Sequence, residues 1–564
     1  MRSAIAFVLA NAIAANAATV TFNWNVTWVW ASPDGFGRPV VGINGQWPPP
    51  PMIVNVKDQV IVQLYNGLGN ESTSLHFHGQ NQGKSQQMEG APPVSQCPLP
   101  PGMSMTYNFT AGNTGTHWYH AHFGGQYMDG FRGPFIALDT TAPFANDYDV
   151  DYTFQVSDWY HEQVPYMLNW YQTVPKATGQ GMEPVPDSTL INNQLDPKFP
   201  MVPGKRYLFR IINTSGFASH VIKFAGHNMT IVEMDGVATV PTVTKKIMIA
   251  AAQRYFVIVT ALSNATKNYG VVSAMMPNMF GNNIQPTDIN MNATAYLVYN
   301  TTTPLPAQPL LKSYKAIHES TIPTFTETPI LGPVTQVVNI TFDFAFINDQ
   351  TRGRINGNTF VAPLVPTIYT TLSAPTNYSI NSTIYGPSTN TVVFNNPVGV
   401  VEINVVSNDN RDHPFHIHGH TAQIVHQGDP GTSAVPDVWN GSYIQTPATR
   451  DVFMVNKFSS TVIRFVSKNP GIWLFHCHIE WHIEAGLVMQ LVEDPIQIQA
   501  LNLTVPQNMY NACQSQGIPI TGNAGGNSVN WFDLSKAPSK PAASPWGAYV
   551  GIPPALKVPY SPLV

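Results

Sequence analysis

The sequence predicts an all-β protein assembled from three β-sandwich domains. Alternating apolar and polar residues form strands, and turn residues separate them at the roughly 8–12-residue spacing of sandwich folds. Two long segments, 57–79 and 397–419, repeat one another, and long repeats indicate duplicated domains. A chain of 564 residues is also too long for one core and long enough for about three.

The repeats set the order of the elements. Residues 57–79 and 397–419 each contain an alternating strand, a polar turn and a final His-x-His-Gly. Residues 115–122 match residues 471–478 in the same way. A third copy at 203–236 keeps the strand pattern but lacks the histidine pairs. We therefore expect two related domains that carry histidine pairs and one domain between them that does not.

Domain boundaries follow from these repeats and from composition. A basic start, an apolar run from Ala4 to Ala15 and a small-x-small end at Ala17 are typical of a signal peptide. Proline is dense at 304–333, and glycine is dense at 522–526. We place a signal peptide at 1–17, domain 1 at 18–142, domain 2 at 143–305, a linker at 306–334, domain 3 at 335–500 and a C-terminal extension at 501–564.

Composition limits the compartment and the partners. The net charge is −5 and only 10% of residues are charged, so no basic surface favours nucleic acid. Thirteen Asn-x-Ser/Thr sequons and the signal peptide indicate a secreted, N-glycosylated protein, either extracellular or in the cell wall. The N-terminal apolar run is too short to span a bilayer, and no other segment reaches 18 apolar residues, so we expect no membrane span.

Residues 476–482, which read His-Cys-His-Ile-Glu-Trp-His, are the most informative segment of the chain. In a strand, Cys477 points to one face while His476 and His478 point to the other. A thiolate with imidazoles is the ligand set of a blue-copper electron-transfer site. Paired imidazoles on the opposite face suit a second copper site, and the cysteine joins the two sites covalently.

Three further histidine clusters strengthen this interpretation. They are His76-Phe-His78, the segment from His117 to His122, and the segment from His413 to His420. A single His-x-His pair is most often two exposed strand residues, but four such clusters in one chain are not explained that way. Structural zinc sites need four ligands at loop-like spacings, often with Cys-x-x-Cys, and this pattern is absent from the sequence.

With these four clusters in order, the chain resembles the multicopper oxidases, including laccases and fungal ferroxidases. The resemblance implies three cupredoxin-like Greek-key sandwiches and four copper ions per chain. It implies type 1 copper ligands His413, Cys477 and His482, type 2 ligands His76 and His416, and type 3 ligands His78, His120, His122, His418, His476 and His478. The other histidines, among them His117 and His420, are expected to be structural.

The resemblance also implies a mechanism. Electrons enter one at a time at the type 1 site, pass through Cys477 to His476 and His478, and reduce O2 to two waters. Glu89 and Glu480 are candidate proton donors, although either could be an ordinary structural carboxylate. Leu487, ten residues after the cysteine, falls at the axial position.

The remaining cysteines predict a disulfide bond. Cys97 and Cys513 are the remaining cysteines, and in an oxidising compartment they should pair, as similar multicopper oxidases do. Two buried free thiols are the alternative. A bridge between them would tie domain 1 to the C-terminal extension.

The reducing substrate is less clearly indicated. Glu183 and Asp409 match acids that bind Fe(II) in iron-oxidising relatives, but the third acid, expected near 278–283, is missing. We also expect no C-terminal membrane helix of the kind that iron-uptake members carry. The sequence therefore favours a monomeric laccase-like oxidase of a phenol, aminophenol or dihydroxynaphthalene, including pigment precursors, with Glu183 or Asp187 as hydrogen-bond acceptor.

Three alternatives remain beside that hypothesis. A soluble ferroxidase would use Glu183 and Asp409. Another organic oxidase, acting on ascorbate or a secondary metabolite, would need the same copper sites. A non-catalytic copper or electron-transfer protein needs only the type 1 ligands, so the eight additional histidines argue against it.

Overall fold

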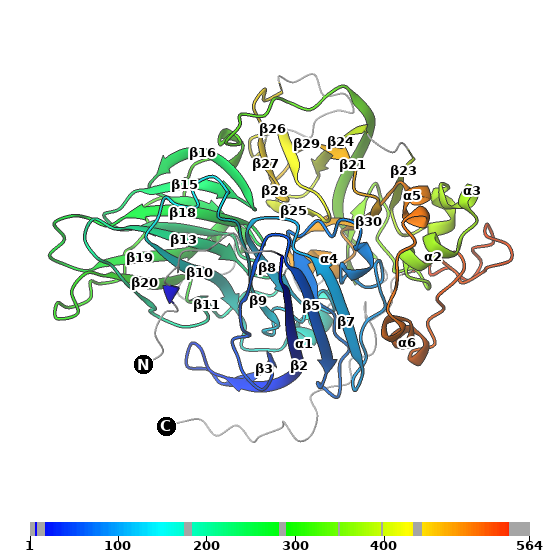
Figure 1. Ribbon diagram of the computed structural model, residues 1–564, viewed down its shortest axis with the longest axis horizontal. Helices are drawn as coiled ribbons and strands as arrows, with labels where there is room; N and C mark the ends of the chain where they lie inside the picture. Colours follow the sequence, from blue (N-terminus) through cyan, green and yellow to red (C-terminus); the bar gives the residue numbers. More distant parts are fainter. Residues whose placement is uncertain are drawn as a thin grey trace.

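The computed structural model describes residues 6–7, 17–173, 183–280, 289–347, 350–395, 399–431 and 443–540. Strands dominate it and form three successive sandwiches of two sheets each (Figure 1). The predicted all-β class and the three cupredoxin-like sandwiches are confirmed. Among the described residues, no helix is long and apolar enough to cross a bilayer.

The first sandwich pairs the sheet β3-β2-β5-β7 with the sheet β4-β9-β8-β6. Its strands alternate as the sequence predicted: Val60, Val62 and Leu64 of β5 point inward, and the residues between them are more exposed. The bounds are β2 (Thr19–Ala31), β3 (Arg38–Ile43), β4 (Met52–Asn55), β5 (Gln59–Asn66), β6 (His76–His78), η1 (Gln86–Met88), β7 (Ser104–Thr110), β8 (Gly115–His120) and β9 (Arg132–Leu138).

The second sandwich pairs the sheet β1-β10-β13-β18-β15-β16, with β11 beside β10, and the sheet β12-β20-β19-β14-β17. Its first strand, β1 (Ala6–Phe7), falls in the predicted signal peptide, and residues 1–5 and 8–16 lie outside the described part. The other bounds are β10 (Val150–Trp159), α1 (Val164–Thr173), β11 (Ser188–Ile191), β12 (Lys198–Pro200), β13 (Arg206–Asn213), β14 (His220–Phe224), β15 (Met229–Met234), β16 (Val237–Thr244), β17 (Ile247–Ile249), β18 (Arg254–Thr260), β19 (Tyr269–Met275), η3 (Pro277–Met279), β20 (Asn292–Val298) and η4 (Glu319–Thr321).

The third sandwich pairs the sheet β22-β21-β24-β29-β26-β27 with the sheet β23-β31-β30-β25-β28. Strand β30 lies inside its sheet between β31 and β25, so every residue from Gly471 to Cys477 is buried. The bounds are β21 (Val334–Ile347), β22 (Gln350–Ile355), β23 (Thr391–Phe394), β24 (Gly399–Ser407), β25 (His413–Ile417), β26 (Ala422–Gln427), β27 (Ala448–Arg450), β28 (Val452–Val455), β29 (Ser460–Ser467), β30 (Gly471–Cys477) and β31 (Val488–Glu493).

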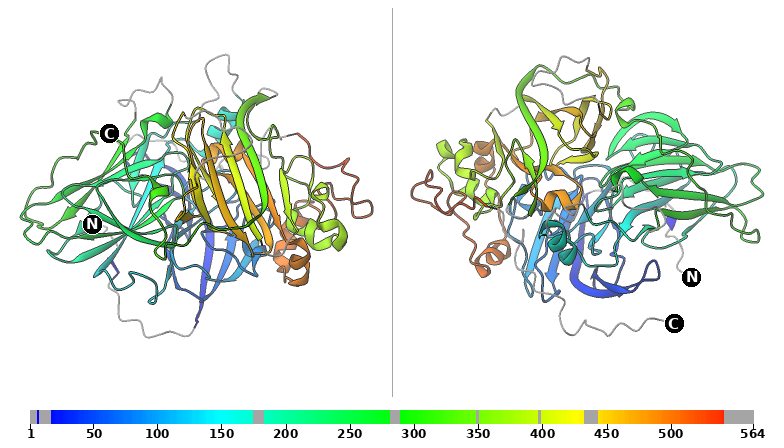
Figure 2. Two further views of the ribbon diagram at one scale, coloured as in Figure 1. Left: turned by 90° about the horizontal axis from the view of Figure 1, so that it is seen from above. Right: turned by 180° about the vertical axis from the view of Figure 1, so that it is seen from behind.

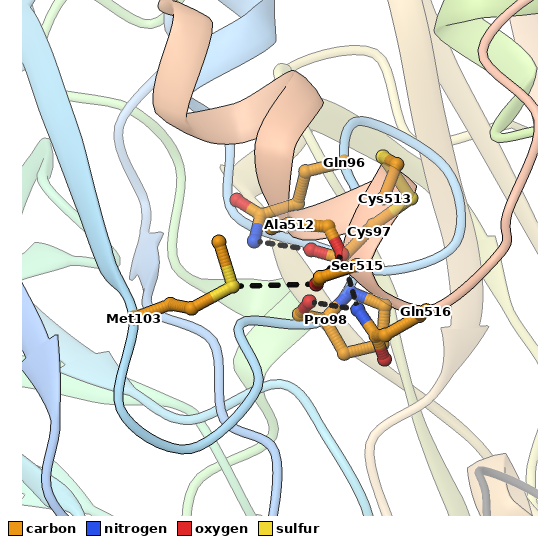
Figure 3. The surroundings of a disulfide bond; sticks show 8 residues. All are labelled: Gln96, Cys97, Pro98, Met103, Ala512, Cys513, Ser515 and Gln516. Carbon is orange, nitrogen blue, oxygen red and sulfur yellow. Dashed lines mark hydrogen bonds between the residues drawn. A yellow bond between two sulfur atoms is a disulfide. The ribbon is translucent and has the colours of Figure 1, made fainter.

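Short helices accompany the third sandwich; α2, α3, α5 and α6 gather at the right of Figure 1, and α4 lies beside β30 near its centre. Their bounds are α2 (Thr367–Ser373), α3 (Thr376–Ser379), η5 (Ser382–Tyr385), α4 (Glu480–Glu484), α5 (Pro495–Ala500) and α6 (Gln507–Ser515). A disulfide joins Cys97 to Cys513 of α6, with their Cα atoms 5.4 Å apart (Figure 3). Around it, Gln516 donates to the Pro98 carbonyl and Ser515 donates to Met103 Sδ. The bridge thus ties the C-terminal extension to the first sandwich.

The repeats seen in the sequence occupy matching places in the first and third sandwiches. The first repeat forms β5 and β6 in one and β24 and β25 in the other, and the second repeat forms β8 and β30. β6 pairs with β8, and β25 pairs with β30, so each sandwich brings its own histidine segments together. The two further views show these sandwiches against one another, with the second sandwich beside them (Figure 2).

Candidate metal centre

Three buried side chains of domain 3 form a group that we call the thiolate centre. Cys477 Sγ lies 3.3 Å from His482 Nδ1 and 3.7 Å from His413 Nδ1. The two imidazole nitrogens are 3.2 Å apart. One thiol and two imidazoles therefore converge on a single point, which is the ligand set of a copper electron-transfer site.

Strand β30 and helix α4 explain this convergence. β30 ends at Cys477, and the turn into α4 brings His482 back next to the cysteine. His413 begins β25, which pairs directly with β30. Burial raises the pKa of Cys477 above its ordinary value, so the thiolate needs a bound cation to form.

Leu487 lies beside the thiolate centre. Its carbonyl accepts a hydrogen bond from the Cys477 N–H at 3.3 Å, and its side chain is fully buried. Met489, two residues later, belongs to β31 and is paired with Phe475 in the sheet. The residue next to the cysteine is therefore a leucine that cannot bind a metal, and the methionine is part of the core.

Eight histidines from domains 1 and 3 meet between the two sandwiches, and we call them the eight-histidine cluster. Rings from the two domains stack on one another: His78 lies on His416 with centroids 3.9 Å apart, and His76 lies on His418 at 4.4 Å. Cys477 sits between two members in sequence, so the cluster and the thiolate centre share β30. The members are His76, His78, His120, His122, His416, His418, His476 and His478.

Burial favours the neutral form of seven imidazoles in this cluster. Burial lowers the pKa of most members well below the ordinary value, and the charges of neighbouring imidazoles lower it further. Burial likewise brings the pKa of His476 to about 4. A neutral imidazole keeps the lone pair that a metal requires. Buried ring nitrogens with no hydrogen-bond partner occur in His76, His78, His120, His416 and His478.

Hydrogen bonds on the opposite ring nitrogens orient these imidazoles. His120 and His476 each place Nδ1 at 2.8 and 2.9 Å from the carbonyl of the following residue. His416 Nδ1 lies 3.0 Å from the Asp451 carbonyl. A carbonyl can only accept, so it fixes the proton on Nδ1 and leaves Nε2 without one. Metal-binding histidines have this arrangement.

Glu89 contacts the cluster directly. Its Oε1 is hydrogen-bonded to His418 Nδ1 and lies 2.9 Å from His76 Nδ1, while Ser95 donates to its Oε2 at 3.2 Å. Burial opposes ionisation of this carboxyl, but its contacts with His76 and Ser95 outweigh burial and lower the pKa of Glu89. Glu89 is therefore a buried carboxylate held against two cluster members.

Glu480 approaches the cluster through a tyrosine. It begins α4 and is buried close to Tyr127, whose ring centroid lies 5.0 Å from that of His120. Burial raises the pKa of Glu480 to about 8. This carboxyl therefore carries a proton at neutral pH, close to the cluster.

Two carboxylates cap the outward nitrogens of the thiolate centre. His482 Nε2 donates to Glu183 Oε1 at 2.9 Å, and His413 Nε2 donates to Asp409 Oδ2 at 3.0 Å. Burial opposes ionisation of both acids, but these histidine partners outweigh it, and the pKa of each acid is lowered. The acids are 11% and 23% exposed, whereas the imidazoles are at most 1% exposed. A reductant outside the protein therefore meets these carboxylates first.

We call the two carboxylates and their neighbours the rim of the thiolate centre, and domain 2 contributes Glu183 and Met279 to it. Arg411 Nη1 donates to Glu183 Oε2 at 2.9 Å and to the Met279 carbonyl at 2.7 Å. Residues 278–280 bring no acid to the rim, as the sequence indicated, and residues 281–283 lie outside the described part. The segment 174–182 before Glu183 also lies outside it.

Other candidate residues have partners elsewhere. Asp187 is 46% exposed and accepts a hydrogen bond from the His161 N–H at 2.7 Å, so its described contacts lie away from the thiolate centre. His117 Nε2 lies 2.9 Å from a nearby carbonyl, and His420 Nε2 lies 2.8 Å from Glu493. Both histidines thus have described partners other than the imidazoles of the cluster, although each adjoins a cluster segment in the sequence.

Sequence reasoning missed Asp451 and Arg254. Asp451 Oδ1 lies 3.4 Å from His78 Nε2, and Arg254 donates to both Asp451 oxygens at 2.6 Å. The three residues come from three domains, so no local spacing connects them. The only signal in the sequence is a pair of opposite charges, at 450 and 451, followed by an apolar strand.

Comparison with known proteins places the chain in a family. Models described as multicopper oxidase match residues 25–142, 150–302 and 360–497. The chain therefore belongs to the multicopper oxidase family, whose members are oxidoreductases that use O2 as the electron acceptor. The family carries copper, and the thiol, the neutral imidazoles and their unpartnered nitrogens fit copper ligation.

Individual relatives are similar over most of their length. The iron transport multicopper oxidase FET3 of Gibberella zeae is 38% identical over 94% of this chain and 84% of its own. The FET3 protein of Saccharomyces cerevisiae is 37% identical over 92% and 82%. The crystal structure titled Fet3p, a multicopper oxidase that functions in iron import, matches with a TM-score of 0.87 at 37% identity, over 91% of this chain and 98% of its own. The laccase of Botrytis aclada matches with a TM-score of 0.74 at 27% identity, over 90% and 93%.

Proposed function

We propose that this protein is a secreted, N-glycosylated oxidase of Fe(II), in which four electrons taken singly from Fe(II) reduce O2 to two waters. The observation that carries the proposal is the pair of carboxylates, Glu183 and Asp409, on the outward nitrogens of the thiolate centre. Hard oxygen ligands suit iron and favour the Fe(III) product, which assists loss of the electron. The similarity to iron transport oxidases supports this function over the phenol oxidation that the sequence favoured.

We assign four copper ions to the residues described above. The type 1 ion would be held by the thiolate centre, with Leu487 as a neighbour that does not bind. Bound copper would supply the one-electron chemistry of electron entry and of O2 reduction. The type 2 ion would be held by His76 and His416, and the type 3 pair by His78, His120, His122, His418, His476 and His478.

The protein itself supplies an electron path and protons. Cys477 is bonded in sequence to His476 and His478, so an electron that reaches the thiolate centre has a short covalent path to the cluster. Reduction of O2 to two waters also consumes four protons. Glu480 carries a proton near the cluster, and Glu89 contacts the cluster directly through His418. We therefore assign proton delivery to these two residues.

A comparison of substrates tests the function. We expect Glu183→Ala to lower kcat/KM for Fe(II) by about 10- to 100-fold, because it removes a carboxylate ligand and the bond to His482. The value for a methoxyphenol should fall by less than about threefold. Equal losses for Fe(II), the methoxyphenol and a dihydroxynaphthalene would contradict the iron proposal and indicate a shared docking role.

Two further variants act as controls for this comparison. Cys477→Ser should abolish the blue absorption and the turnover of every reductant, and retained turnover would contradict the electron path. Asp187→Ala should not alter the ratio of kcat/KM for Fe(II) to kcat/KM for the methoxyphenol, because Asp187 is hydrogen-bonded to the His161 N–H. A selective loss of phenol oxidation in that variant would favour an organic substrate.

One observation favours oxidation of an organic reductant as the second candidate. The second oxygen of Glu183 is already bonded to Arg411, and residues 278–280 bring no third acid. A phenol, aminophenol or dihydroxynaphthalene needs only one acceptor for its hydroxyl group, and the fold is also similar to that of a laccase. A higher wild-type kcat/KM for the dihydroxynaphthalene than for Fe(II) would select this candidate.

A further inference from the structure

Arg411 places a permanent positive charge at the rim of the thiolate centre. It lies in the loop between β24 and β25, two residues before His413. Its guanidinium is 18% exposed and bridges domain 3 to domain 2 through Glu183 and the Met279 carbonyl. A guanidinium carries a delocalised positive charge on a planar fork of N–H donors, which suits a carboxylate partner.

The bridge leaves Glu183 without a free oxygen. Oε1 accepts from His482 and Oε2 accepts from Arg411, both at 2.9 Å. Asp409 is bonded to His413, and Asp412 accepts from the Lys457 N–H and from Asn278. Each described carboxylate at this rim therefore already has a hydrogen-bond donor.

A metal cation and Arg411 compete for the same oxygen. A divalent cation that binds Glu183 must displace the guanidinium from Oε2 or bind close to a like charge, and like charges within a few ångströms repel even at a partly exposed site. An organic reductant meets the opposite situation, because a guanidinium has five N–H donors, and its remaining donors can bond a hydroxyl or phenolate oxygen.

We propose that Arg411 is a specificity-determining residue of the electron-entry site, which weakens the binding of metal cations at Glu183 and favours hydroxylated aromatic reductants. The inference rests on the proposed role of Glu183 in electron entry. It means that Fe(II) reaches Glu183 only at the expense of the bond between Glu183 and Arg411.

The test compares Arg411→Gln with the wild-type copper-loaded enzyme. We expect the KM for Fe(II) to fall by about five- to tenfold, because the competing charge is gone. The KM for a hydroquinone should rise, because donors are lost. Zn²⁺, which cannot be oxidised, should inhibit hydroquinone turnover with a Ki that is also about five- to tenfold lower in the variant. Arg411→Lys keeps the positive charge, so its KM for Fe(II) and its Ki for Zn²⁺ should stay close to the wild-type values.

Two controls make the result interpretable. Arg206→Gln removes an exposed arginine that pairs with exposed Asp147, and it should leave all three constants unchanged. An Arg411→Gln variant whose Fe(II), hydroquinone and Zn²⁺ constants shift together would show a merely structural role and overturn the inference. If neither enzyme oxidises Fe(II), the proposed function fails, and the Zn²⁺ constant still decides the role of Arg411.

Discussion

At the scale of single residues, the cluster is built from ring nitrogens with two different roles. One nitrogen of His120, His416 and His476 is oriented by a carbonyl, and burial lowers the pKa of each of these imidazoles. Unpartnered polar nitrogens in a protein interior cost free energy unless something binds them. The cluster contains such nitrogens because a metal requires neutral imidazoles whose lone pairs are already oriented.

Glu71 gives a residue-scale prediction about pH. Burial and the nearby Asp129 raise its pKa from 4.5 to about 7. Below pH 4.5 the folded and unfolded chains both hold this proton. Between pH 4.5 and 7 only the folded chain holds it, so Glu71 increasingly destabilises the fold as pH rises, and above pH 7 the cost is complete. Glu71→Gln should therefore stabilise the protein by about 1–3 kcal/mol at pH 8 and by about zero at pH 4.

Thermal unfolding at the two pH values checks this. The Tm of Glu71→Gln should exceed the wild-type Tm at pH 8 and match it at pH 4. Glu327→Gln, at an exposed position, is the matched control and should not alter Tm at either pH. The same change in Tm at both pH values would show that the effect of Glu71 is not electrostatic.

The copper motifs could be read from the sequence because histidines two residues apart in a strand share a face. His76 with His78 and His476 with His478 therefore carried their own signal. Arg411 carried none, since its partners Glu183 and Met279 lie more than 100 residues away along the chain. Long-range bonds between buried charges depend on how domains pack, and no local period encodes this.

At the scale of elements, β30 and α4 work as one unit. The strand ends at Cys477, the helix returns His482 to it, and Gly486, with a φ of +94°, turns the chain so that Leu487 meets the cysteine backbone. The sequence predicted the strand and the alternation of faces. It did not predict the helix, because five residues show no helical period.

Helix α6 gives an element-scale prediction. It is attached to the first sandwich by the disulfide from Cys513 to Cys97, which closes a separation of 416 residues, and both cysteines are buried. Replacing both with alanine should lower stability by about 3–5 kcal/mol, because the unfolded chain loses a long cross-link. The Tm should fall, and amide exchange in α6 should accelerate more than exchange in β5.

The matched control is Ser515→Ala on the same helix, which removes the hydroxyl bonds to Met103 Sδ and to the Ala512 carbonyl but keeps the disulfide. It should leave α6 exchange close to the wild type. If the double variant lowers Tm but α6 exchange is unchanged, the disulfide acts on the unfolded chain alone and does not hold the helix in the folded protein.

At the scale of the whole molecule, buried ion pairs connect the three domains around the cluster. Arg254 of domain 2 holds Asp451, whose carbonyl and carboxylate face His416 and His78. Next to this pair, Arg450 joins domain 3 to domain 2 and to the linker. The three-domain organisation was predictable from repeats, but this interface was not, because the sequence places its charges far apart.

Arg450 provides the prediction at this scale. Its fully buried guanidinium lies 2.9 Å from Asp235 and 2.6 Å from Glu319. Arg450→Met should leave two buried carboxylates with too little positive charge, which costs about 3–5 kcal/mol. Calorimetry should show a lower Tm, and copper content should fall because the neighbouring Asp451 orients His416. Arg354→Met, which breaks a pair that is about one-third exposed, is the control and should cost less than about 1 kcal/mol. If Arg450→Met is no more damaging than this control, the buried network does not hold the domains together.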